Sequence, residues 1–312
     1  MSAGIKIAAI GECMIELSQR DDGAMSLAYG GDTLNTAVYL ARLCAGGEHT
    51  VDYLTALGDD PYSAEMLAFW RREGIGTDLV ARLPGRLPGL HTIRTDQRGE
   101  RSFHYWRSAA AAREMLRGEA GQRLAEALPG YDLIYLSGIS LSILDDAGRD
   151  RLIDGLDTAR GAGARVAFDS NYRPGGWADA ATAGAVMDRL LRRADIALPS
   201  LDDERALHGD IGADRAARRI AGLEVGEICI KDGAGDCLIW QDGKTTRVAA
   251  EPGITPVDTT AAGDSFNAAY LHRRLSGADP TAAARAGHRL AGAVIGHRGA
   301  VLPASAMPAM DV

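Results

Sequence analysis

Short apolar runs alternate with amphipathic segments along most of the chain. The apolar runs have the length of buried strands, and the amphipathic segments repeat their apolar residues at helical spacing. Strands are expected at residues 5–10, 51–57, 133–136, 165–168, 195–198 and 228–230. Helices are expected at residues 33–44, 61–72, 120–128, 148–160, 180–193, 212–222, 263–276 and 279–296. This alternation is typical of an α/β fold in which a mostly parallel central sheet is flanked by helices.

Three stretches depart from this alternation. Residues 236–240 and 245–248 flank the turn Asp242-Gly243, which predicts a hairpin on an antiparallel edge of the sheet. Two further stretches, within about 12–30 and 90–106, consist of short strands around the polar turns at 19–23 and 96–100. We expect them to form a small β-sheet lid on a single domain that spans residues 1–312.

Composition excludes several classes of protein. The net charge of −8 argues against nucleic-acid binding, which depends on a basic field. No apolar stretch is long enough for a membrane span, and the first residues lack a signal-peptide pattern. The four cysteines are scattered, without a CxxC pair, so we expect buried, reduced thiols and a cytoplasmic protein.

The segment from Val257 to Ala269 carries the strongest chemical signal. Asp258 and Asp264 bracket a run of small residues, and a helix is expected to begin where that run ends. The free N–H groups of a helix start attract an anion such as phosphate. A carboxylate placed there would suit proton abstraction from a hydroxyl that attacks phosphorus. The alternative is that Asp264 only caps the helix.

Two glycine-containing segments suggest ligand contacts. A strand ends at Lys231 and is followed by a turn containing Gly233, which could set a cation and amides near a nucleotide. No GxxxxGK[ST] motif is present, so a P-loop kinase is not expected. The pair Gly30-Gly31 opens a helix and would let a polyol approach the backbone. Alternatively, Asp32 or Thr33 only caps that helix.

Two arginines follow aromatic residues. Arg107 closes the second lid hairpin after Tyr105-Trp106, and Arg173 follows Tyr172 beyond a buried strand. Open α/β sheets bind ligands at the carboxyl ends of their strands. Arginine there can form a forked contact with a carboxylate or phosphate, although either residue could instead form a surface salt bridge.

Together these segments resemble the ribokinase (PfkB-type) family of carbohydrate kinases. The resemblance runs from Gly11-Glu12 through Gly30-Gly31-Asp32-x-x-Asn35 to the segment 258–267. Within the family, Tyr105-Trp106-Arg107, the segment 168–173 and Ser200-Leu201-Asp202-Asp203-Glu204 are most similar to the branch of 2-keto-3-deoxygluconate kinases. The resemblance implies a ribokinase-like, Rossmann-like domain with a β lid that uses ATP and Mg²⁺. A monovalent cation such as K⁺ is a further possibility.

The resemblance also implies roles for individual residues. Asp264 matches the catalytic base, with the amides of Ala261, Ala262 and Gly263 as its anion hole. The residues that match sugar-binding and sugar-acid-binding positions are Gly31, Asn35, His91, Tyr105, Arg107, Arg173 and Asp258. The residues that match the nucleotide side are Asn171, Ser200, Lys231, Gly233, Gly263, Ala291 and Val294, and Asp203 matches the acid near the metal.

Three positions depart from the family pattern. Ala261 stands where a glycine is usual, and at a positive φ it would cost on the order of 1 kcal/mol. Ser200 and Asp203 represent the usual Asn-x-x-Glu, so an acid is retained near the metal. His91 stands where the branch often has tyrosine.

The expected activity is ATP-dependent phosphorylation of 2-dehydro-3-deoxy-D-gluconate at its 6-hydroxyl. The alternatives are a kinase for fructose, ribose or a related keto-deoxy acid, and a non-catalytic sensor on the same fold. Because a small sheet has exposed edges and an apolar face, we also expect a homo-oligomer, with dimerisation through the lid.

Overall fold

The computed structural model describes residues 4–20, 22–47, 49–95, 101–209 and 212–310. Its centre is a nine-stranded sheet with the order β15-β14-β13-β12-β11-β10-β1-β4-β6. These strands are β1 (Lys6–Ile10), β4 (Thr50–Leu54), β6 (Ile75–Gly76), β10 (Leu133–Ser137), β11 (Arg165–Asp169), β12 (Ile196–Ala197), β13 (Glu227–Ile230), β14 (Cys237–Gln241) and β15 (Lys244–Val248). The strands from β6 to β13 pair in parallel, whereas β14 and β15 form the predicted antiparallel edge hairpin.

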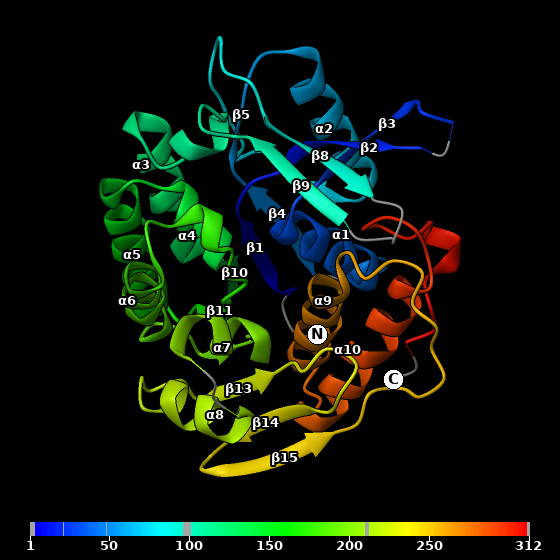
Figure 1. Cartoon of the computed structure of the whole chain (residues 1–312). Helices are drawn as coiled ribbons and strands as arrows, with labels where there is room; N and C mark the ends of the chain where they lie inside the picture. The colour runs from blue at the N-terminus through cyan, green and yellow to red at the C-terminus, as the bar shows by residue number, and fades with distance from the viewer. Residues whose placement is uncertain (1–3, 21, 48, 96–100, 210–211, 311–312) are drawn as a thin grey trace.

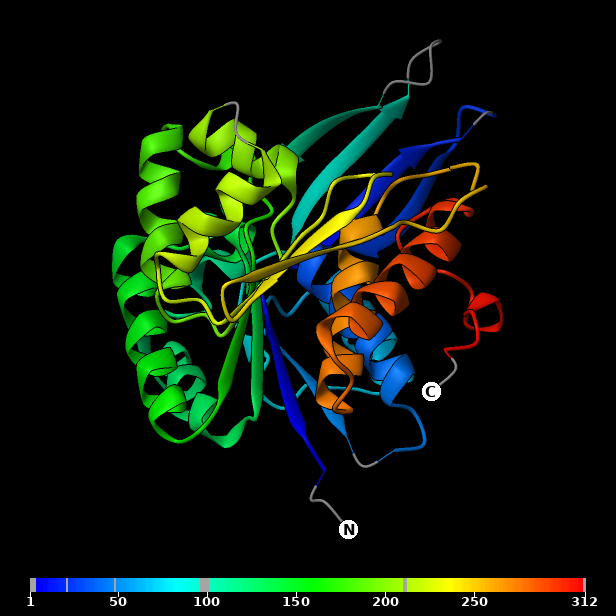
Figure 2. The same ribbon diagram turned by 90° about the horizontal axis from the view of Figure 1, so that it is seen from below.

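Helices cover both faces of this sheet (Figures 1 and 2). One face carries α3 (Gly118–Ala127), α4 (Gly138–Ile143), α5 (Asp146–Gly161), α6 (Ala180–Leu191), α7 (Leu201–His208) and α8 (Ala213–Ala221). The other carries α1 (Asp32–Cys44), α2 (Pro61–Arg72), α9 (Ala262–Leu275) and α10 (Pro280–Ile295). Alternate residues of each strand enter opposite cores: in β1, Ala8 and Ile10 pack in one, and Ile7 and Ala9 in the other.

The lid is a separate four-stranded sheet with the order β3-β2-β8-β9. Its strands are β2 (Met14–Gln19), β3 (Met25–Gly30), β8 (Gly89–Thr95) and β9 (Arg101–Trp106). The two predicted hairpins are joined by parallel pairing of β2 with β8, with Ile15 opposite Leu90. Figure 2 shows these strands projecting beyond the main domain. The predicted turn at 96–100 lies outside the described residues.

Some local predictions need correction. The strand expected at 51–57 divides after Leu54, because β5 (Ala56–Leu57) pairs with β7 (Ala81–Arg82) in a separate two-stranded sheet. The helices α4 and α7 were not predicted, since neither is long enough to show a clear apolar period. Short 3₁₀ helices occupy Ala111–Glu114, Leu128–Gly130, Pro174–Gly176 and Ala304–Ala306.

Two global predictions can be compared with the structure. All four cysteines are buried and free, as expected. In the described part of the chain, every helix lacks the combination of length and apolar character that crossing a bilayer requires.

Candidate active site

A cavity of about 660 Å³ lies between the inner face of the lid and the carboxyl ends of the central strands. It gathers most of the predicted site residues. Those that line it are Gly31, Asn35, His91, Tyr105, Asn171, Arg173, Ser200, Asp203, Lys231, Gly233, Ala261, Ala262, Gly263, Asp264 and Ala291. These residues come from distant parts of the sequence, and the parallel sheet brings them together because its loops emerge at one edge.

The start of α9 is shaped by Ala261. This residue is the N-cap and adopts the left-handed conformation, with φ 60° and ψ 17°. Ala261 therefore has the positive φ that was considered for this usual glycine position, at a cost of about 1 kcal/mol. The first helical bond runs from the Ser265 amide to the Ala261 carbonyl, at 2.9 Å. Within this first turn the Ala262 amide donates to the Thr259 carbonyl at 3.3 Å, and Ala262, Gly263 and Asp264 all line the cavity, where a helix start would stabilise a phosphate oxygen.

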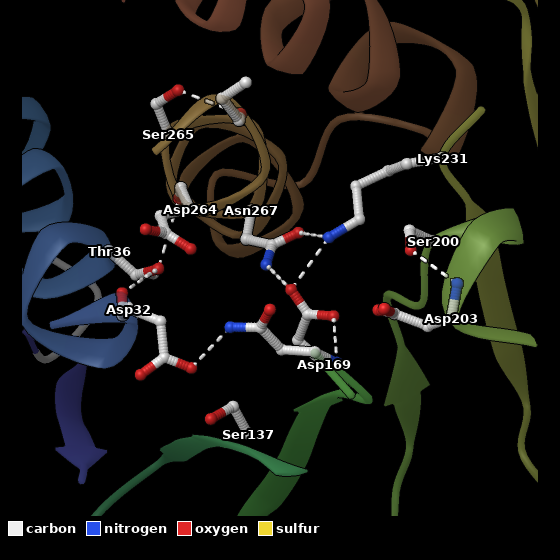
Figure 3. Close-up of polar contacts among 12 residues, drawn as sticks. Asp32, Thr36, Ser137, Asp169, Ser200, Asp203, Lys231, Asp264, Ser265 and Asn267 are labelled. Carbon is white, nitrogen blue, oxygen red and sulfur yellow. Dashed lines mark hydrogen bonds and ion pairs between the residues drawn. The ribbon is translucent and has the colours of Figure 1, made fainter. Parts of the chain in front are cut away.

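Asp264 is not the cap of α9. Its Oδ2 accepts a hydrogen bond of 2.8 Å from the Asn35 side-chain amide on α1, and its backbone carbonyl accepts one from the Thr36 hydroxyl. Figure 3 shows its carboxylate directed toward α1, near Asp32. Burial, followed by repulsion from Asp32, raises the pKa of Asp264 to about 8. A carboxylate with this pKa is a much stronger proton acceptor than an ordinary aspartate.

Lys231 lies beside the start of α9. Its Nζ contacts Asp169 Oδ2 at 2.8 Å and Asn267 Oδ1 at 2.9 Å (Figure 3). The Asn267 amide donates in turn to the same Asp169 oxygen, at 2.6 Å. A Cβ added to Gly263 would lie 3.5 Å from Lys231 Nζ, so the ammonium group is in van der Waals range of the helix start. The result is a fixed positive charge next to the first turn of α9.

Asp169 and Asn267 were missed as site residues. Both stood in segments singled out from the sequence, and Asp169 is the last residue of a buried strand, a position typical of ligand-binding acids. Glu16 was also missed. It lines the cavity from the lid, where its Oε2 lies 3.2 Å from Nε2 of the buried His91.

The helix that follows the glycine pair begins one residue earlier than expected. Gly31 is the N-cap of α1, and Asp32 is its first residue, so neither Asp32 nor Thr33 is the cap. Asp32 Oδ2 accepts a hydrogen bond of 2.7 Å from the side-chain amide of Asn171. Asn171 has a φ of 31°, a left-handed conformation that asparagine tolerates better than most residues. Asp32 thus adds a second carboxylate to the same wall of the cavity as Asp264.

Asp203 provides carboxylate oxygens suited to a magnesium ion, whereas the Asp169 carboxylate is already engaged by Lys231, Asn267 and the Asn171 amide. Burial, followed by repulsion from Asp169, raises the pKa of Asp203. Ser200 caps α7 by accepting a hydrogen bond from the Asp203 amide, and Arg173 lies 3.7 Å from the Asp203 carboxylate. In the described residues, no group of three metal-ligating side chains is present. The single carboxylate of Asp203 fits Mg²⁺, which usually takes one or two carboxylates and completes its shell with water and nucleotide phosphates.

Three predicted site residues lie outside the cavity lining. Val294 is fully buried beneath Ala291, because it lies on the core side of α10. Asp258 is buried and accepts hydrogen bonds from the Thr260 amide at 2.9 Å and the Gly299 amide at 2.8 Å. Arg107 lines a second cavity, of about 1140 Å³, at the β9 edge of the lid. Tyr105 and Arg173 line both cavities, so the two are adjacent.

Comparison with known proteins shows the family to which the chain belongs. The profile of the pfkB family carbohydrate kinases matches residues 5–307, and the chain belongs to this family. It is 47% identical over 307 residues to the 2-dehydro-3-deoxygluconokinase of Dickeya dadantii, covering 97% of this chain and 98% of that one.

Solved structures show the same fold. The 2-dehydro-3-deoxygluconokinase from Thermotoga maritima superposes with a TM-score of 0.81 at 22% identity, over 96% of both chains. A putative ribokinase II from E. coli in complex with ATP and Mg²⁺ gives a TM-score of 0.80 at 20% identity, over 95% of this chain and 94% of that one. The ribokinase-like fold and the carbohydrate-kinase class expected from the sequence are therefore confirmed.

Proposed function

We propose that the protein is an ATP-dependent sugar-acid kinase that phosphorylates 2-dehydro-3-deoxy-D-gluconate on its 6-hydroxyl, yielding 2-dehydro-3-deoxy-6-phosphogluconate. The observation that carries the phosphotransfer is the position of Asp264 at the start of α9, between Asn35 and Lys231. The choice of substrate is supported by the high identity to the Dickeya relative. In this proposal, residues 1–312 act as one kinase domain with its lid.

Proton removal is the role we assign to Asp264. The substrate hydroxyl would lie against its carboxylate and lose a proton as the oxygen attacks the γ-phosphorus. The amides of Ala261, Ala262 and Gly263 would stabilise charge on the transferred group, with Lys231 beside them. Because these groups are held in place before the reaction, little reorganisation is needed during transfer.

The nucleotide would enter from the side of Lys231. Gly233 and Ala291 line that part of the cavity and leave space for the base and ribose, with Asn171 and Ser200 nearer the phosphates. Asp203 would hold Mg²⁺, which supplies charge neutralisation on the phosphate oxygens. Val294 supports Ala291 from the core. Asp258 braces the loop before α9, where a monovalent cation such as K⁺ would act.

The sugar acid would occupy the lid side of the cavity. Gly31 and Asn35 would contact its hydroxyl groups from the start of α1. Tyr105 and His91 face this space from the lid, with their ring centroids 5.7 Å apart. Arg173, which lines both cavities, and Arg107, which lines the second, would bind the carboxylate, at roughly 1.5–3 kcal/mol for each charged hydrogen bond.

An ATP-consumption screen over sugar acids and neutral sugars tests this proposal. The purified chain should turn over 2-dehydro-3-deoxy-D-gluconate with Mg²⁺, in parallel assays with K⁺ and Na⁺. Much faster turnover of fructose or ribose would overturn the substrate assignment. Phosphotransfer to none of the sugars, combined with ligand-induced thermal stabilisation, would favour a sensor instead.

The proposal includes a homodimer formed through the lid in a cytoplasmic enzyme. The outer face of the lid exposes Met25, Leu27 and Trp106, with exposed fractions of 46%, 45% and 61%. An apolar face of this kind is expected to pack against a second copy. Leu27→Glu should therefore convert a dimer to a monomer in light-scattering measurements, and a monomeric wild-type protein would refute this part.

A further inference from the structure

Glu12 lies where the chain crosses between the main domain and the lid. The chain enters β2 just after Glu12, leaves β3 at Gly30, enters β8 at Gly89 and leaves β9 just before Arg107. A Cβ on Gly89 would be 2.6 Å from Glu12 Oε1, and one on Gly31 would be 2.1 Å from the Glu12 carbonyl oxygen. Arg107 Nη2 donates to Glu12 Oε2. All four crossings therefore meet around this one residue.

The Glu12 side chain has no contact with solvent. Its exposed fraction is 0%, against 21% for Arg107. Burial raises the pKa of Glu12, and the Arg107 charge is the largest opposing influence. Among the described residues, Glu12 Oε1 and Arg107 Nε are buried without a hydrogen-bond partner. Glu12 is too enclosed to touch a substrate, and its side chain is hydrogen-bonded to Arg107, the group through which it can act on a bound anion.

Arg107 is partly exposed at the other end of this pair. Its guanidinium carbon lies 5.8 Å from the centre of the Tyr105 ring, and it lines the second cavity together with Arg173. A guanidinium has five N–H donors. With one nitrogen bonded to Glu12, donors remain for a carboxylate that lies between Arg107 and Arg173.

We propose that Glu12 is a positioning residue for recognition of the substrate carboxylate. Its buried ion pair holds the Arg107 guanidinium in one orientation at the base of the lid, with the remaining donors directed to the sugar acid. Without Glu12, Arg107 would sample other rotamers, and binding would have to order it again. This inference rests on the proposed sugar-acid kinase function.

The decisive experiment measures steady-state kinetics of Glu12→Gln, which keeps the shape and one acceptor but removes the charge. The KM for the sugar acid should rise roughly tenfold, the equivalent of one weakened charged hydrogen bond. The kcat and the KM for ATP should stay within about twofold, because the reacting groups are untouched. Glu12→Asp keeps the charge but has a shorter side chain, so it should give an intermediate KM for the sugar acid. This variant tests the proposal if Glu12→Gln does not fold.

A double-mutant cycle separates positioning from a purely structural role. In an Arg107→Gln background, Glu12→Gln should have no further effect on the KM for the sugar acid. Independent, additive effects would overturn the proposal. The matched control is Glu65→Gln, which removes the charge from a different lid-to-domain contact, the hydrogen bond from the Tyr29 hydroxyl to Glu65. This control should leave the KM for the sugar acid unchanged.

The kinetic results distinguish a failure of the proposed function from a failure of the role of Glu12. If the wild-type chain phosphorylates no sugar acid, the proposed function falls and the role of Glu12 falls with it. If the wild-type chain is active and Glu12→Gln and Glu12→Asp have normal KM values, only the positioning role is refuted.

Discussion

The carboxylate of Asp264 on α9 accepts a hydrogen bond of 2.8 Å from the side-chain amide of Asn35 on α1. The two residues are 229 positions apart in the sequence. Their contact ties the candidate base to the helix that follows the lid strand β3, and so to the part of the site that would hold the sugar. It also stabilises the ionised form of Asp264 against the repulsion from Asp32.

Asp264→Asn should reduce kcat by about 10²–10⁴-fold, the usual contribution of a general base. The affinity for ATP should change little, because the amides of α9 and Lys231 remain in place. Single-turnover kinetics and calorimetric titration with an ATP analogue would measure the two effects separately. Near-normal turnover in this variant would refute the base assignment.

The same substitution should stabilise the fold at high pH. The pKa of Asp264 is raised to about 8 in the folded protein, so folding favours its protonated form. The folded protein binds more protons than the unfolded chain, and wild-type stability falls as pH rises from about 4 towards 8. Asp264→Asn should therefore be more stable than wild type by about 5 kcal/mol at pH 9, with almost no difference near pH 4. Denaturant unfolding at both pH values tests this expectation.

The pH profile of kcat/KM should rise with an apparent pKa near 8, because the free enzyme must lose the Asp264 proton before it can act as a base. Asn35→Ala removes a hydrogen bond that favours the charged carboxylate. The rising limb should then move to higher pH, and activity at pH 7 should fall. If the apparent pKa of the rising part of the profile is unchanged in Asn35→Ala, a group other than Asp264 controls it.

Ala261→Gly should stabilise the protein slightly. Glycine removes the steric cost of the left-handed φ of 60°, although the unfolded chain gains entropy. The net gain should be about 0.5 kcal/mol. Activity should be retained, since the direction of the amides does not change. A loss of stability in thermal unfolding would contradict the strain described at this position.

Lys231→Met should weaken both catalysis and folding. The substitution removes the cation beside the start of α9, so the KM for ATP should rise and kcat should fall. It also leaves the buried Asp169 carboxylate without its ion pair, at a cost of about 3 kcal/mol. Lys231→Arg is the control that keeps the charge and should recover stability more fully than activity. Unchanged ATP kinetics in Lys231→Met would place the nucleotide elsewhere.

Much of the secondary structure and the family could be predicted from the sequence alone, because both depend on local patterns of residues. Apolar periodicity predicted the α/β layers and the edge hairpin, because strand and helix periods depend only on neighbouring residues. Helix α2 begins and ends at the predicted residues, since Asp60 caps its start and Pro61 occupies its first position. The signature around Asp264 identified the family, because small residues and an acid at a helix start form a local motif.

Only the tertiary structure decided how distant residues meet. It placed Asp32 and Asp169 near Asp264, which raises its pKa, and it paired Arg107 with Glu12 across the base of the lid. It also directed Asp258 to backbone amides and Val294 into the core. These outcomes depend on the order of strands in the sheet and on which side of a helix faces inward. Burial and charge repulsion between segments act through space, and residue spacing along one chain does not encode those distances.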